Sequence, residues 1–472
     1  MNGKLMFAMA ALATLLVSCK GGNKDTATAY DGPAVKAVIF PGDYPDPSIM
    51  REGNDFYMTH SCFTYYPGLL IWHSTDLLHW EPVARAVQGQ NYSIFAPELC
   101  KVDGKYYIYY PTSDNRNYVV VADRIEGPWC EPIQLDVVGI DPGHVVDEQG
   151  NRYLYSNDGY MVQLSADGLH ALGNNKNTKA YDGWQYPSDW VTEGFWLESP
   201  KLTKHGDWYY LITAEGGTAG PETSHMVVVA RSKSVTGPWE NSPYNPMIHT
   251  YSADEEWWSK GHGTLIDDAD GNWYIVYHAY RNSFHTLGRS TIVESVRWTD
   301  DEWPVAVQEN GALWENGGFQ EDYSYLRDFD NPLLWAKWEP GVDGTAGFEK
   351  VIDGTLMTAT AIDTAYTIEA EFSLTGSSRA GLYLFYNENA FFGTNLGAAA
   401  ASDGKLFIRI ENKCNIASLW TSTDGENWTL VEGGKDVSTY HHNTYKGFFA
   451  LRPAYLTTPG ATLTAFRYQA NS

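Results

Sequence analysis

Apolar positions along the first two thirds of the chain recur in one pattern: a short polar turn, an aromatic unit such as Tyr-Tyr or Trp-Tyr, and then a β-branched run. The aromatic units recur every roughly 45 to 65 residues, the range in which self-similar four-stranded units stack around an axis. The pattern therefore predicts an all-β fold that begins with a five-bladed β-propeller. The five units lie at residues 55–57, 104–107, 150–153, 206–210 and 271–274.

The pattern changes near Gly317, where the dense use of Trp and Tyr ends. From Leu326 onward, shorter segments alternate apolar and polar residues, as in 367–372 and 405–410, and turn signals such as 423–425 separate them. Segments of this kind are typical of a β-sandwich. We therefore expect a second all-β domain of the concanavalin-like type, and no long helix outside the first residues.

The first residues are read as a targeting segment. Lys4 precedes an apolar run over 5–17 that is too short to span a bilayer, and the run ends in a sequence that resembles a bacterial lipobox before Cys19. That resemblance implies cleavage and lipidation of Cys19, and an exported lipoprotein at the cell surface or outer membrane of a bacterium. The predicted segments are a signal peptide (1–18), a lipidated cysteine with a flexible tether (19–36), the propeller (37–318) and the sandwich (322–472).

The composition of the chain limits the classes of molecule that it is expected to bind. Aromatic residues make up 14% of the chain, with 18 Trp and 32 Tyr, which fits strand-rich folds and also sugar binding. The formal net charge of −26 argues against nucleic acid or an anionic membrane surface as the partner, because both require clustered Lys and Arg. Neutral glycans remain compatible with this charge, and contact with a membrane is expected only through the lipid anchor.

Four cysteines remain besides Cys19, namely Cys62, Cys100, Cys130 and Cys414. They show neither a C-x-x-C spacing nor a companion histidine pattern, so a zinc site is not expected. An exported protein can pair such cysteines, and buried free thiols are the alternative. The sequence leaves both open.

Three carboxylates stand in comparable places of three different repeats, each one short strand ahead of an aromatic unit: Asp46, Asp141 and Glu198. A propeller brings the inner strand of every blade to one central mouth, where residues far apart in sequence converge. Each acid is followed by proline, directly or one residue later, and a single pair of this kind is usually only a turn. Three of them in the same place of the repeat predict a carboxylate site at the mouth.

On these residues and on several further motifs, the first domain resembles glycoside hydrolase family 43. This family consists of five-bladed propellers and includes β-xylosidases, α-L-arabinofuranosidases, arabinanases and some galactan-active enzymes. The resemblance covers roughly residues 37 to 315, and the second domain is similar to the C-terminal β-sandwich of xylosidase-like members. The matching segments are 44–48, 66–68, 71–77, 96–98, 141–142, 198–202, 213–218, 261–263 and 287–289.

The resemblance implies a role for each acid: Asp46 as general base, Glu198 as general acid, and Asp141 as the group that orients the acid and tunes its pKa. The family inverts the anomeric configuration, which requires a base that activates water and a protonated acid on the opposite face of the sugar. Two departures stand out, since Ser199 replaces a common Gly and Glu98 a frequent Asp. Glu193 is a rival acid by chemistry alone, but only Glu198 is followed by the Ser-Pro-Lys-Leu sequence.

The resemblance also implies the sugar-binding residues. Phe63, Tyr65 and Phe95 match aromatic positions of the first subsite, and Arg289 matches a position that reaches substrate hydroxyls. His262 matches a central histidine that ligates calcium in some relatives and faces the sugar in others. No cofactor is required, and a structural calcium ion near the propeller axis is the one metal that the resemblance suggests.

Together these observations predict an inverting, exo-acting glycosidase that removes terminal β-D-xylose or α-L-arabinofuranose from plant cell-wall polysaccharides or oligosaccharides. A galactan-directed exo-hydrolase of the same family is the first alternative. The second, from a different functional class, is a glycan-binding lipoprotein without catalysis, which would have no use for a base, an acid and a pKa modulator together. The sandwich is expected either to bind polysaccharide or to brace the propeller.

Overall fold

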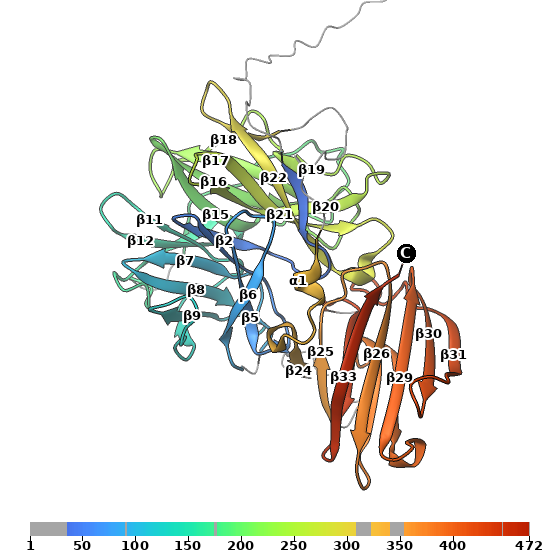
Figure 1. Cartoon of the computed structure of the whole chain (residues 1–472). Coiled ribbons are helices and arrows are strands. Elements are labelled where there is room, and N and C mark those ends of the chain that lie inside the picture. Colours follow the sequence, from blue (N-terminus) through green and yellow to red (C-terminus); the bar gives the residue numbers. More distant parts are fainter. Residues whose placement is uncertain are drawn as a thin grey trace, which may run out of the picture.

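The computed structural model describes residues 35–89, 92–173, 177–307, 322–339, 354–445 and 447–471, most of them in strands and the loops between strands (Figure 1). The predicted signal peptide, Cys19 and nearly all of the tether lie outside these residues. The one α-helix of the described part is α1 (Ser324–Arg327). A helix long and apolar enough to cross a membrane is not found among the described residues. The all-β prediction is confirmed.

Five antiparallel sheets form the first domain. The first contains β2 (Ser48–Glu52), β3 (Asp55–Thr59), β5 (Gly68–Ser74) and β6 (Glu81–Val87). The second contains β7 (Glu98–Val102), β8 (Lys105–Pro111), β9 (Asn117–Ala122) and β10 (Ile133–Leu135). The third contains β11 (Gly143–Val146), β12 (Arg152–Ser156), β13 (Tyr160–Leu164) and β14 (Thr178–Lys179).

The fourth sheet contains β15 (Glu198–His205), β16 (Trp208–Glu215), β17 (Met226–Ser232), β18 (Glu240–Asn241) and β19 (Ile248–His249). The fifth contains β20 (Trp257–Asp267), β21 (Trp273–Arg281), β22 (Arg289–Trp298), β23 (Pro304–Ala306) and β1 (Lys36–Phe40). The predicted aromatic units fall on the second strand of each meander, namely β3, β8, β12, β16 and β21.

The five sheets close into a ring. Their first strands contact one another in turn around the axis, β2 with β7, β7 with β11, β11 with β15, β15 with β20, and β20 with β2. The ring is closed by β1, which comes from the start of the chain and pairs antiparallel with β22 near the end of the domain. Closure of this kind joins the two ends of the propeller and covers the edge of the last sheet. Strand β1 begins at Lys36, the last residue of the predicted tether.

The second domain is a sandwich of two sheets. One has the order β31-β30-β29-β26-β33, and in its inner strand β26 buried side chains alternate with less buried ones, as expected for a sheet with one face in the core. The other has the order β28-β27-β32-β25-β24-β4. The strands are β24 (Ala336–Trp338), β25 (Thr355–Thr358), β26 (Ala365–Leu374), β27 (Arg379–Asn387), β28 (Ala390–Gly397), β29 (Lys405–Lys413), β30 (Ile416–Ser422), β31 (Thr429–Asp436), β32 (Arg452–Thr457) and β33 (Ala461–Ala470).

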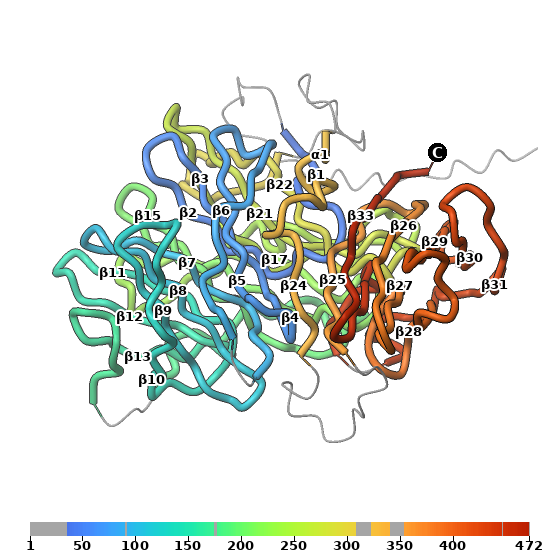
Figure 2. The backbone as a smooth tube through the Cα atoms, turned by 60° about the horizontal axis from the view of Figure 1, so that its bottom comes forward, coloured from blue at the N-terminus to red at the C-terminus, as the bar shows by residue number. Residues whose placement is uncertain are grey.

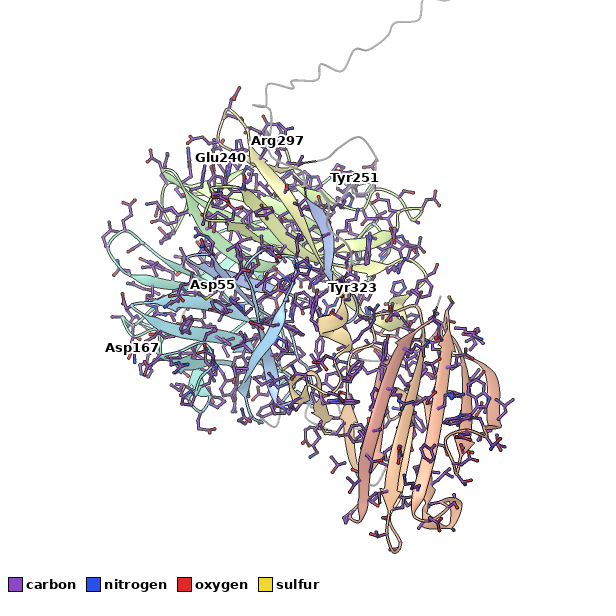
Figure 3. The ribbon with its side chains drawn as sticks, viewed as in Figure 1. Asp55, Asp167, Glu240, Tyr251, Arg297 and Tyr323 are labelled. Carbon is purple, nitrogen blue, oxygen red and sulfur yellow. The ribbon has the colours of Figure 1, made fainter. Side chains whose placement is uncertain are left out.

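The propeller and the sandwich share one sheet and one hydrophobic core. Strand β4 (Tyr65–Tyr66) comes from a propeller loop, yet it pairs with β24 of the sandwich (Figure 2). The Tyr65 ring packs against Trp338 and Phe449, with ring centroids 5.5 and 6.1 Å apart. Tyr323, labelled in Figure 3, donates a hydrogen bond to the Val38 carbonyl in β1 at 2.8 Å. These contacts favour a bracing role for the sandwich.

The four cysteines of the described part are free thiols: Cys62 is buried, Cys100 and Cys130 are half-buried, and Cys414 is exposed. Burial raises the pKa of Cys62 to about 11, so this thiol stays protonated near neutral pH.

A buried ion pair also joins the domains. Arg452 lies 2.7 Å from the Asp43 carboxylate, and its guanidinium stacks over the Tyr65 ring at 3.8 Å. Arg452→Met keeps much of the packing but leaves Asp43 buried without its cation, so we expect a loss of about 3 to 5 kcal/mol in the free energy of unfolding, measured by urea denaturation. Arg379→Met, at an exposed position, is the matched control. Equal stability of the two variants would contradict the importance of the pair.

Candidate active site

The three carboxylates meet where three inner strands begin. Asp46 and Asp141 each lie two residues before their strand, and Glu198 is the first residue of β15. Asp46 and Asp141 have left-handed backbones, with φ of 58° and 56°; in the fourth sheet this conformation falls on Ser199, with φ of 56°. Glu198 therefore stands one residue earlier in the structural repeat than the other two acids, and the register shift between Glu198 and Lys201 accompanies this offset.

A polar layer directly below the acids fixes the inner strands. Lys201 Nζ lies 2.7 Å from the Glu98 carboxylate and donates to the carbonyls of Pro97 and Pro142 at 2.9 and 3.2 Å. The Ser48 hydroxyl donates to the same Glu98 carboxylate at 3.1 Å. Because these residues come from the inner ends of four sheets, the network sets the spacing of the strands that carry the acids. Glu98 is the centre of this layer, because its carboxylate binds both Ser48 and Lys201.

Asp46 is held as a carboxylate. Its Oδ1 lies 2.9 Å from Arg289 Nη1, and the Ser61 hydroxyl donates to Oδ2 at 2.5 Å. Burial by itself raises the pKa of this carboxyl, but the Arg289 guanidinium, helped by His262 and His278, holds the pKa of Asp46 well below its usual range. Asp46 is therefore ionised near neutral pH, which is the state that a general base needs.

The pKa values of the other two acids, Asp141 and Glu198, are raised rather than lowered. Burial, and after it the charge of Asp46, raises the pKa of Asp141 to about 7, while Lys201 and a hydrogen bond from the Ser199 N–H (3.2 Å) counteract this shift. Burial and the charges of Asp141 and Asp46 raise the pKa of Glu198 well above its usual range. The Glu198 side chain is still 22% exposed, so a substrate can reach its proton.

The site thus combines an ionised carboxylate with a protonated carboxylic acid at one mouth. Titratable groups whose environments push their pKa values apart are the usual arrangement of a general base and a general acid. Such a pair suits hydrolysis in which one carboxyl activates water and the other protonates a leaving oxygen.

Three ligand-type side chains also come together at the mouth. Among the described residues, Asp46, His262 and His278 offer ligand atoms within 4.8 Å of one another. Nδ1 of His278 lies 3.1 Å from the Asp46 backbone nitrogen and 3.1 Å from its Oδ1, so this ring is bound closely to Asp46. Calcium prefers six to eight oxygen ligands, whereas this set has one carboxylate, already paired with Arg289. The set does not fit a calcium cage, and the calcium ion stays a prediction.

The residues predicted for sugar binding lie in two environments. Arg289 and His262 are buried beside Asp46, at 2.9 and 3.4 Å from its Oδ1. Phe63 is buried and Phe95 half-buried, with ring centroids 6.3 Å apart. Tyr65 fills the contact between the domains and is 2% exposed, so a sugar contact for its ring stays a prediction.

Other residues at the site were not singled out from the sequence. Ser61 and His278 bind Asp46 directly, and His225 lies 4.0 Å from Glu198. Phe448 reaches the site from the sandwich, with the Arg289 guanidinium 5.3 Å from the centre of its ring. Phe448 lies more than 400 positions after Asp46 in the chain, so no short sequence motif could have indicated this contact. Only the docking of the two domains creates it.

Asp141→Asn tests the electrostatic link between the acids. The change removes a buried negative charge that raises the pKa of Glu198, so that pKa should fall, and Glu198 should lose its proton at lower pH. We expect the alkaline limb of the pH dependence of kcat/KM to move down by roughly one pH unit or more. Hydrolysis of a pentoside between pH 4 and 10 measures the shift. An alkaline limb at the wild-type position, in a variant that unfolds at the wild-type temperature, would contradict the link.

Comparison with known proteins agrees with this geometry. The sequence model of "Glycosyl hydrolases family 43" matches residues 35–304. The chain is 30% identical over 444 residues to "Xylosidase/arabinosidase 43B" of Humicola insolens, covering 80% of this chain and 79% of that protein. It is 31% identical to "Non-reducing end alpha-L-arabinofuranosidase BoGH43B" of Bacteroides ovatus, covering 83% and 77%. The match to "Xylan 1,3-beta-xylosidase" of a Vibrio species spans 57% of each chain at 33% identity.

The fold is shared with solved structures. The GH43 protein BlXynB of Bacillus licheniformis superposes with a TM-score of 0.76, covering 93% of this chain and all of that one, at 24% identity. The propeller and the sandwich therefore occur together in that protein too.

Proposed function

Because the chain belongs to glycosyl hydrolase family 43, we propose that it is an inverting, exo-acting glycosidase that releases terminal β-D-xylose or α-L-arabinofuranose units. The observation that carries this proposal is the opposite ionisation of Asp46 and Glu198 at one mouth. Neither a binding module nor a scaffold needs a carboxylate and a carboxylic acid kept in different protonation states.

The proposed reaction uses both acids at once. Glu198 gives its proton to the glycosidic oxygen, and the bond between that oxygen and the anomeric carbon breaks. Asp46 takes a proton from a water molecule, which attacks the anomeric carbon from the opposite face, so the configuration inverts. Asp141, bound to the Ser199 N–H at 3.2 Å, keeps the pKa of Glu198 high before the reaction. The Arg289 guanidinium keeps Asp46 ionised.

Exo action is supported by the position of the sandwich at the mouth. His442 and Phe448 of the sandwich lie against the fifth sheet: the Tyr280 hydroxyl and His442 Nδ1 are 3.1 Å apart, and the Arg289 guanidinium lies over the Phe448 ring. A wall on one side of the carboxylates favours a pocket that accepts a chain end over a groove open at both ends. The two domains would then form the pocket jointly.

The pentose specificity rests on the relatives. Their names are xylosidase and arabinofuranosidase, so we propose plant cell-wall polysaccharides or oligosaccharides as the substrates. These names do not favour a galactan-directed enzyme, and the presence of both catalytic groups does not favour a binding protein without activity.

Sugar release from aryl β-D-xylopyranosides, α-L-arabinofuranosides and β-D-galactopyranosides tests the proposal, with product configuration followed by NMR. We expect activity on one or both pentosides, none on the galactoside, and an inverted first product. Galactoside activity, or a retained anomer, would refute the respective part of the proposal. Xylobiose and an arabinoxylan oligosaccharide should be included, because a substrate can need more than one subsite.

We further propose that the protein is an exported lipoprotein anchored through Cys19. The basic residue Lys4, the apolar run over 5–17 and the lipobox-like sequence before Cys19 support this. In a bacterial host, labelled palmitate should be incorporated into the wild type and not into Cys19→Ala. Equal labelling of both would refute it.

A further inference from the structure

His225 stands out as a buried polar group that the mechanism above leaves unused. It lies directly before β17, its side chain has no exposed surface, and neither ring nitrogen has a hydrogen-bond partner among the described residues. Burying an imidazole with two unpaired nitrogens costs free energy, so such a group calls for an explanation at the site itself.

The ring is held in one place. It stacks on His278 with ring centroids 5.3 Å apart and an interplanar angle of 13°. The backbone of β20 also comes so close to the ring that a Cβ on Gly261, the cross-strand partner of His278, would lie 1.7 Å from His225 Cδ2. The glycine therefore makes room for the imidazole, and this packing directs Nε2 toward the general acid, 4.0 Å from Glu198 Oε1.

The ring is uncharged near neutral pH. Burial lowers the pKa of His225 well below its usual value, and the neighbouring His278, His262 and Arg289 lower it further, against the opposing charge of Asp46. A neutral imidazole carries one N–H and one lone pair, and the ring cannot act as a cation toward Glu198.

We propose that His225 is a positioning residue for Glu198: its Nε2–H donates a hydrogen bond to Oε1 of the acid when substrate closes the site. This inference rests on the proposed function. The distance of 4.0 Å is longer than a hydrogen bond, as catalytic contacts often are before substrate binds. With Oε1 held by His225, the other carboxyl oxygen carries the proton and faces the glycosidic oxygen.

The contact gains strength during the reaction. When the proton passes to the glycosidic oxygen, Glu198 becomes a carboxylate, and a hydrogen bond to a charged acceptor is stronger than one to a neutral acid. His225 keeps its own proton throughout. Since the stabilisation appears as charge develops on Glu198, it lowers the barrier more than it improves ground-state binding.

Leaving-group dependence separates this role from a structural one. His225→Phe should lower kcat/KM roughly 10- to 100-fold for xylobiose and phenyl pentosides, which need the acid. It should change kcat/KM less than about threefold for a dinitrophenyl pentoside, whose leaving group needs little protonation. His225→Gln, whose amide nitrogen can reach the place of Nε2, should recover most of the loss. His205→Phe, outside the site, is the control. An equal loss for all leaving groups, or no loss, would overturn the proposal.

A second readout does not depend on activity. Histidine ¹⁵N NMR of the full protein, with the His225 signal identified by its loss in His225→Phe, should show a neutral ring protonated at Nε2 whose signal moves in Glu198→Gln. A ring protonated at Nδ1, or a signal indifferent to Glu198→Gln, would overturn the role of His225. If the wild type cleaves no pentoside while the NMR result is as expected, the proposed substrate class fails and the contact stands.

Discussion

Replacing Glu198 with glutamine is expected to lower kcat/KM for xylobiose or an unactivated pentoside by roughly 10²- to 10⁴-fold, the usual contribution of a general acid. The reason lies in its environment: burial and two neighbouring carboxylates keep the proton on Glu198 near neutral pH, and glutamine has no proton to give. For a dinitrophenyl pentoside the loss should be much smaller. The alkaline limb of the pH dependence should also disappear, because it reports the deprotonation of Glu198. Steady-state kinetics across a series of leaving groups measures both effects.

Glu193 supplies the matched control. It lies five positions before Glu198, its side chain accepts a hydrogen bond from the Ala219 N–H at 3.0 Å, and its charge raises the pKa of Glu198 less than the charges of Asp141 and Asp46 do. Glu193→Gln should retain activity within about threefold and keep the alkaline limb. If Glu193→Gln loses activity in the leaving-group-dependent way and Glu198→Gln does not, the assignment of the acid is reversed.

Asp46→Asn should abolish most activity on every substrate, roughly 10³-fold or more, including the dinitrophenyl pentoside. Activation of water by the base is needed whatever the leaving group, so the two variants differ in their dependence on the leaving group. The loss should persist at all pH values, because asparagine cannot accept the proton. In the wild type, the acid limb of the pH dependence of kcat/KM should lie at low pH, because Arg289 lowers the pKa of Asp46. Activity should fall only when the pH drops through that lowered pKa.

Stability must be measured beside activity for this variant. Asp46→Asn leaves the Arg289 guanidinium buried without its carboxylate, which we expect to lower the free energy of unfolding by about 3 to 5 kcal/mol. Asp267→Asn breaks a more exposed pair with Arg51 and is the control, with an expected loss within about 1 kcal/mol. Folded Asp46→Asn with wild-type turnover would rule out Asp46 as the base.

The fold was predictable because its evidence is local. Each blade is a short meander whose turn, aromatic unit and β-branched run lie within a few residues, so strand propensity and turn chemistry indicate it directly. The repeat of that unit predicted five blades, and the alternating segments after Leu326 predicted the sandwich. Closure of the ring by β1 was not visible, because pairing between Lys36 and Glu294 joins segments more than 250 positions apart.

The sequence by itself determined the blades, the sandwich and the three acids at the mouth, since strand patterns and short motifs depend on neighbouring residues. The tertiary structure decided how those acids differ. Asp46 is ionised because Arg289, His262 and His278 converge on it, and Glu198 stays protonated because burial and two carboxylates surround it. The same convergence placed His225 beside the acid and Phe448 over Arg289. Electrostatic shifts depend on distance and burial in space, and neither quantity is defined until the chain has folded.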